Sequence, residues 1–135
     1  MRPRRGRRGL GLATLLAGLA LVAGCGGPKN VTVTGTVLSN GKPVALSPTG
    51  TLQVTLMPDV PPDQAYTTFV NDCDKEGKFT IENVPPGKYK IGIEQLDPTP
   101  QNDKLNGRFS AANTKIIREI DGKQPLVIDL AKPEG

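Results

Sequence analysis

The sequence predicts an all-β fold, a seven-stranded antiparallel β-sandwich over residues 31–131 of the 135-residue chain. Apolar residues recur at every second position from Val31 onward, which is the pattern of strands that bury one face. Turn signals separate these runs, and this part of the chain lacks the 3.6-residue period of a helix. Short strands joined by turns over about a hundred residues are typical of a sandwich.

The expected strands share the same alternation of apolar and polar side chains. In the first run, Val31, Val33 and Val37 point to one side and threonines to the other. The later runs are centred on these apolar residues: Leu52, Val54 and Leu56; Phe79 and Ile81; Tyr89, Ile91 and Ile93; Leu126, Ile128 and Leu130.

Two segments fit the alternation less closely. Residues 65–71 form a looser strand pattern, and residues 114–120 fit either a strand or one helical turn. The adjacent β-branched residues Ile116 and Ile117 favour the strand. The proline-dense connections cannot supply regular ladders and are expected to be surface loops: 46–49, 57–63 and 96–103.

Glycine marks the expected turns between strands. The Asn-Gly pair at 40–41 and the Glu-Gly pair at 76–77 are each predicted to turn tightly on two residues with positive φ. In the Pro-Pro-Gly segment at 85–87, the prolines fix an extended approach and the glycine lets the chain turn into the next strand. The Asp-Gly pair at 121–122 marks a further turn.

Three segments together resemble the carboxypeptidase-regulatory-like domains. Residues 35–44 contain Gly-Thr-Val followed by Asn-Gly-Lys-Pro-Val, similar to that family's opening G-x-V and G-K-P-V. Residues 72–79 (Asp-Cys-Asp-Lys-Glu-Gly-Lys-Phe) resemble its T-D-x-x-G-x-F turn, apart from Asn71 where the family often has Thr. Residues 84–89 (Val-Pro-Pro-Gly-Lys-Tyr) resemble its V-P-P-G-x-Y hairpin. The resemblance implies a transthyretin-like (prealbumin-like) sandwich and points to small bacterial lipoproteins with one such domain as relatives.

The N-terminus has the order of a secretory signal peptide. Five arginines within residues 2–8 precede the uncharged run 10–22, and Gly24 and Cys25 follow it. This run is shorter than the roughly 20 residues that cross a bilayer, which favours a cleaved signal over a retained anchor. The Gly-Cys end resembles the lipobox of bacterial lipoproteins, in which the cysteine receives a diacylglyceryl group and acyl chains such as palmitate.

This interpretation divides the chain into four parts. They are a signal peptide (1–24), the lipidated Cys25 with its tether (25–30), the sandwich domain (31–131) and a short tail (132–135). The protein is expected to leave the cytoplasm by general secretion and to be anchored by lipid to a membrane of the bacterial cell envelope. An ordinary signal peptide with an unmodified Cys25 is the main alternative.

The charge distribution argues against a nucleic-acid partner. The formal net charge of the chain is +4, but five of its 17 Lys and Arg residues lie in the signal peptide and all 13 Asp and Glu residues follow it. The mature chain would be near neutral and would have no basic patch. The expected partners are the membrane, through the lipid on Cys25, and an envelope protein or polysaccharide.

The composition also excludes several kinds of catalysis. The chain has no histidine, so it has no histidine general base, Ser-His or Cys-His pair, or histidine metal ligand. With Cys25 lipidated, Cys73 has no disulfide partner in the chain, and it is either a small buried hydrophobe or a reactive thiol. We therefore expect no catalytic residue, no cofactor and a non-catalytic structural or binding module. A transthyretin-like hydrolase is the least favoured alternative, because such enzymes rely on histidines.

One acidic cluster is a candidate metal site. Asp72, Asp74 and Glu76 alternate ahead of a glycine, as oxygen ligands do in a calcium loop. Counted from Asp72, position 12 is Asn83, where an EF-hand has a bidentate Glu. The cluster is therefore interpreted as a solvated turn, with calcium binding as the weaker alternative. A carbohydrate-binding module is a further alternative, although the chain has no Trp for sugar stacking.

Loops are the expected ligand-facing surface, because loops on a rigid scaffold carry most binding residues. We place that surface at the loops 57–63 and 96–110, with Tyr66 beside the first and Phe109 within the second.

Overall fold

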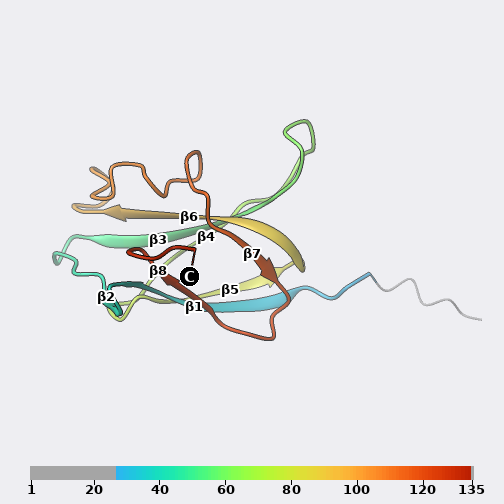
Figure 1. Cartoon of the computed structure of the whole chain (residues 1–135), viewed down its shortest axis with the longest axis horizontal. Helices are drawn as coiled ribbons and strands as arrows, with labels where there is room; N and C mark the ends of the chain where they lie inside the picture. Colours follow the sequence, from blue (N-terminus) through green and yellow to red (C-terminus); the bar gives the residue numbers. More distant parts are fainter. Residues whose placement is uncertain (1–26, 135) are drawn as a thin grey trace, which may run out of the picture.

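Two four-stranded sheets face one another in the computed structural model, which describes residues 27–134 (Figure 1). The predicted all-β sandwich is confirmed. The predicted signal peptide and Cys25 lie outside the described residues. The strands are β1 (Val31–Ser39), β2 (Lys42–Pro43), β3 (Thr51–Pro58), β4 (Phe69–Asp72), β5 (Lys78–Val84), β6 (Gly87–Leu96), β7 (Ile117–Ile120) and β8 (Leu126–Asp129).

The second sheet has the strand order β4-β3-β6-β7, and all its pairs are antiparallel. In the first sheet, β1 pairs antiparallel with β2 and β5 but parallel with β8, from Gly35↔Leu126 to Leu38↔Asp129. The sequence indicated only antiparallel neighbours. The difference arises because the chain crosses from β7 in one sheet to β8 in the other, and alternation of side chains carries no information about strand direction.

The core lies between the sheets and is built from the residues that the alternation placed inward. The longer strands turn most of their apolar side chains toward the opposite sheet, as strands of a sandwich do, while Val70, Ile117 and Val127 are exposed. Full burial of one such aliphatic side chain contributes about 1.5–3 kcal/mol to stability. The most deeply buried aliphatic residues are Val37, Leu52, Val54, Leu56, Val84, Ile91, Ile93 and Ile128.

The seven longer strands match the predicted runs, and the two-residue β2 is additional. The strand predicted over residues 114–120 is shorter in the structure, where β7 begins at Ile117 and residues 114–116 belong to the preceding loop. The proline-dense segment 57–63 is only partly a loop, because β3 continues through Met57 to Pro58. Pro58 is tolerated there because it lies beyond the β3–β4 pairing, which ends at Leu56↔Phe69, so that β3 is an edge at this residue.

The Asn-Gly turn at 40–41 is confirmed, with φ values of 51° and 73°. At 76–77 the prediction was half wrong, because only Gly77 has a positive φ, of 80°. Gly77 also lies directly against β1: its carbonyl accepts a hydrogen bond from the Val37 N–H at 2.8 Å. A Cβ at this position would lie 2.2 Å from the Val37 carbonyl oxygen, so the contact requires glycine.

The long connection from β6 to β7 is an ordered loop rather than a flexible one. The Asp103 carboxylate accepts hydrogen bonds from the backbone N–H groups of Gln95, Leu105 and Gly107. Further along, the buried Thr114 hydroxyl donates to the Ile91 carbonyl at 2.6 Å. These bonds satisfy backbone groups that a sheet would otherwise pair.

Within residues 27–134, the structure has no helix long and apolar enough to cross a membrane.

We predict that Gly77→Ala destabilises the sandwich far more than Gly41→Ala. The two glycines have similar φ values, 80° and 73°, but an added Cβ meets the β1 backbone only at Gly77 and open space at Gly41. Gly41→Ala should cost about 1 kcal/mol in the free energy of unfolding from backbone strain. Gly77→Ala should cost about 1–3 kcal/mol more because the strands must separate. Urea unfolding followed by circular dichroism measures both, and equal losses would contradict the close-contact explanation.

Candidate functional site

A groove with a volume of about 580 Å³ opens at the end of the sandwich where β1 begins. One side is the β3–β4 loop, residues 59–68, and the other is the β5–β6 turn at 83–88. Asn30, the last residue before β1, also lines it. In Figure 1 the β3–β4 loop (green) extends from the same end of the sandwich as residues 27–30. The sequence segments around the groove are therefore far apart in the chain and adjacent in space.

Two aromatic rings form a rigid floor for the groove. Phe69 and Tyr89 pack edge to face, with ring centroids 6.4 Å apart. The Tyr89 hydroxyl donates a hydrogen bond to the Pro85 carbonyl at 2.7 Å, which ties the floor to the β5–β6 turn. Burial raises the pKa of Tyr89, so the hydroxyl stays a proton donor at neutral pH.

The sides of the groove carry amide and aromatic groups. Tyr66 is 53% exposed on the β3–β4 loop. The side-chain amides of Asn30, Gln64 and Asn83 line the same space. These groups can donate and accept hydrogen bonds and offer an aromatic face.

Two charged residues, Asp59 and Lys88, line the groove and connect the β3–β4 loop to β6. The Asp59 N–H donates to the Lys88 carbonyl at 2.8 Å, which joins the loop to β6. The Asp59 carboxylate lies 4.0 Å from the Lys90 ammonium. Among the described residues lining the groove, no nucleophile is paired with a base. The groups that line the groove are able to contact a ligand through hydrogen bonds and aromatic faces.

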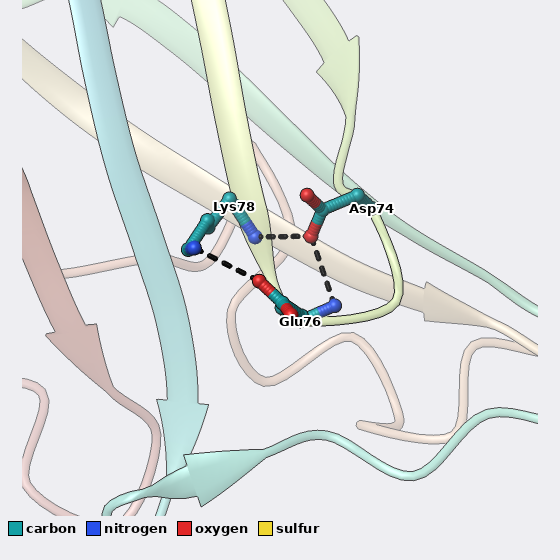
Figure 2. Close-up of polar contacts among 3 residues, drawn as sticks. All are labelled: Asp74, Glu76 and Lys78. Carbon is teal, nitrogen blue, oxygen red and sulfur yellow. Dashed lines mark hydrogen bonds and ion pairs between the residues drawn. The ribbon is translucent and has the colours of Figure 1, made fainter.

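The acidic cluster forms a turn, as Figure 2 shows for Asp74, Glu76 and Lys78. One Asp74 carboxylate oxygen accepts the backbone N–H groups of Glu76 and Lys78, both at 2.9 Å. Glu76 pairs with the Lys78 ammonium at 2.8 Å, and this pair raises the pKa of Lys78. Asp72 accepts a hydrogen bond from the Gln53 amide at 3.3 Å.

These contacts use the three carboxylates separately rather than as one ligand set. Residues 27–134 contain no group of three His, Cys, Asp or Glu side chains placed to hold a metal ion. The cluster forms the exposed turn that connects β4 to β5.

Cys73 lies directly after β4, half-buried against the core, as a free thiol. Its N–H donates to the Leu52 carbonyl at 2.7 Å, which extends the β3–β4 pairing by one residue. Burial, with smaller contributions from Asp74 and Asp72, raises the pKa of Cys73 to about 12. A thiol with this pKa is protonated at neutral pH and is a poor nucleophile. The environment thus favours the small-hydrophobe interpretation.

The two predicted ligand-facing loops have different roles. Residues 58–60 and Tyr66 do line the groove. Phe109, by contrast, is 6% exposed and packs in the core, so its placement on a ligand-facing surface was wrong. The loop 97–116 contributes Phe109 and Ile116 to the core, and its Leu105 packs against that core. The groove is also lined by Phe69, Pro85 and Tyr89, which side-chain alternation and turn signals indicated only as strand and turn residues.

Comparison with known proteins identifies the family. Residues 28–120 match the family described as BOS complex subunit NOMO1-like, second beta sandwich domain. The chain belongs to this family. The match covers β1 to β7 and with them the whole groove, and the domain has the transthyretin/prealbumin-like type of fold that the sequence implied. No curated protein and no solved structure matches the chain.

We expect Asp74→Ala to destabilise the protein by about 1 kcal/mol, because two backbone N–H groups of the turn lose their acceptor. Glu76→Ala, which removes only an exposed ion pair, should change the free energy of unfolding much less. Millimolar Ca²⁺ should leave the melting temperature of the unmodified chain unchanged. Stabilisation by Ca²⁺ that Asp74→Ala abolishes would instead support a metal site.

The pKa of Cys73 predicts slow alkylation of the folded protein. In a full chain carrying Cys25→Ser, Cys73 is the sole thiol. At pH 9 it should react with iodoacetamide at least about tenfold more slowly when folded than in urea, because only the unfolded chain ionises there. The raised pKa contributes stability below pH 9 that is lost between pH 9 and about 12. Cys73→Ala should lose less stability than its parent over that range, and equal alkylation rates would contradict the burial argument.

Proposed function

We propose that this chain is a membrane-anchored envelope lipoprotein whose β-sandwich is a non-catalytic structural or binding module. The observation that carries the proposal is the exposed segment 27–30 ahead of β1, joined to the Gly-Cys motif of the sequence. No atom lies within 4 Å of where a Gly27 side chain would be. A tether of this kind lets a lipid on Cys25 enter a membrane while the sandwich stays folded.

The chemistry of the described residues supports a module without catalysis. The chain has no histidine, and burial raises the pKa of the half-buried Cys73 thiol to about 12. The groove presents an exposed tyrosine and amides rather than an acid–base pair. The family is named for a β-sandwich domain of a complex subunit, which fits a structural role.

The groove is where we place the envelope partner, either a protein or a polysaccharide. Its open shape, its aromatic floor and its three amide side chains suit a ligand held by stacking and hydrogen bonds. The turn at 72–76 gives less support to a calcium-dependent module, because Asp72 and Asp74 already accept hydrogen bonds from the protein and Glu76 pairs with Lys78.

Metabolic labelling tests the anchor. In bacteria grown with an alkyne analogue of palmitate, the full-length chain should incorporate the label and fractionate with membranes. Its intact mass should correspond to a chain that starts at Cys25 and carries acyl groups. Cys25→Ser should remove essentially all the label, whereas the matched variant Cys73→Ser should keep it. An unlabelled wild-type chain with residues 1–24 still present would refute the proposal.

A further inference from the structure

We propose that the groove end of the sandwich rests on the bilayer that holds the Cys25 lipid, with Tyr66 inserted among the phospholipid headgroups. This inference rests on the proposed lipid anchor and adds an orientation to it. It assigns the β3–β4 loop, residues 59–68, as a second membrane contact and commits to the bilayer interface as what that loop touches.

The first argument is the short reach of the tether. Six residue steps separate Cys25 from Val31, the first residue of β1, and such a segment spans at most about 22 Å when fully extended. Asn30 lines the groove together with Tyr66 and Gln64, so the tether leaves the sandwich beside the β3–β4 loop. The opposite end is farther away by the length of β1, about 26 Å at 3.3 Å per residue. An anchored protein therefore holds the groove end close to the lipid surface.

The second argument is the chemistry of the loop. Residues 61–68 are all exposed, and Tyr66 presents 53% of its surface to solvent. Tyrosine favours the headgroup layer, where its ring lies among the lipid chains and its hydroxyl stays hydrated. Because the lipid anchor already keeps the loop near the surface, even a weak interfacial preference is enough to hold it there.

The third argument is that the loop is held in shape. The Val60 N–H donates to the Pro58 carbonyl and the Gln64 N–H to the Pro61 carbonyl, both at 3.0 Å. Asp59 fixes the base of the loop to Lys88 on β6. These bonds fix residues 58–64, two positions before Tyr66, so inserting Tyr66 costs less conformational entropy than inserting a residue of a free chain.

The charge around the loop permits contact with either zwitterionic or anionic lipids. Lys29 and Lys88 are exposed at this end, Asp63 is exposed on the loop, and Asp59 lies next to Lys90. The charges of the two signs nearly balance, so headgroups are neither strongly attracted nor repelled. The groove would then open toward the headgroup layer, and its partner would be bound at the membrane surface.

A single tryptophan at each end of the sandwich tests the orientation, because the chain contains no Trp. Tyr66→Trp places the reporter on the β3–β4 loop. Ala45→Trp places the same indole at an exposed site just after β2, at the opposite end. Each lipidated full-length variant is reconstituted into phosphatidylcholine vesicles, with and without phosphatidylglycerol. Brominated lipids that carry bromine near the headgroups then quench any indole in the interface.

Quenching in the Tyr66→Trp variant should exceed that in the Ala45→Trp variant by at least about twofold. It should be accompanied by a blue shift of the emission, in vesicles of either composition. Equal quenching in chains whose mass confirms the lipid would overturn the orientation and leave the anchor standing. Absence of lipid on Cys25 in the native product would overturn both proposals. The Ala45→Trp control removes the objection that any added indole partitions into lipid.

Discussion

The strands β3 and β6 pair side by side along an eight-residue antiparallel ladder, from Thr51↔Leu96 to Pro58↔Tyr89. Their aliphatic side chains are among the most deeply buried in the described structure, and they form the surface on which β1, β5 and β8 pack. β4 and β7 pair with the outer edges of this same ladder. Every connection except the β1–β2 turn begins or ends at a strand of this sheet.

Polar contacts close the two sides of the sandwich. On one side, the Asn71 side chain of β4 donates to the Thr80 carbonyl of β5 and so links the two sheets. On the other, the Arg118 guanidinium of β7 donates to the Pro133 carbonyl of the C-terminal segment at 2.7 Å. The Asp129 carboxylate accepts hydrogen bonds from the Ala131 N–H and from the backbone N–H groups of the turn at 40–41. These bonds, with the one from Ala131 contributing most, lower the pKa of its carboxyl group. The two ends of the sandwich therefore differ: one carries the turn at 40–41 bound by Asp129, and the other carries the groove.

This asymmetry connects the fold to the proposed role. The groove, the β3–β4 loop and the tether occupy one end, so a lipid anchor would decide which surface of the module meets the membrane. The acidic turn and Cys73 lie on the strand connection from β4 to β5, and their contacts stabilise that connection. Asp74 and Cys73, which the sequence offered as a candidate metal ligand and a candidate reactive thiol, therefore stabilise the connection between these two strands.

The Asn-Gly pair was sufficient to predict the turn at 40–41. Side-chain alternation predicted the seven longer strands and inward residues such as Val33 and Ile91, because these depend on neighbours one or two positions apart. It was insufficient for contacts between distant segments. No local signal in the sequence indicates the parallel pairing of β8 with β1 or the insertion of Phe109 into the core. The same is true of the placement of Tyr66 in one groove with the turn at 85–87. Such contacts arise only when the sheets stack, since burial of apolar surface then selects which remote segments come together.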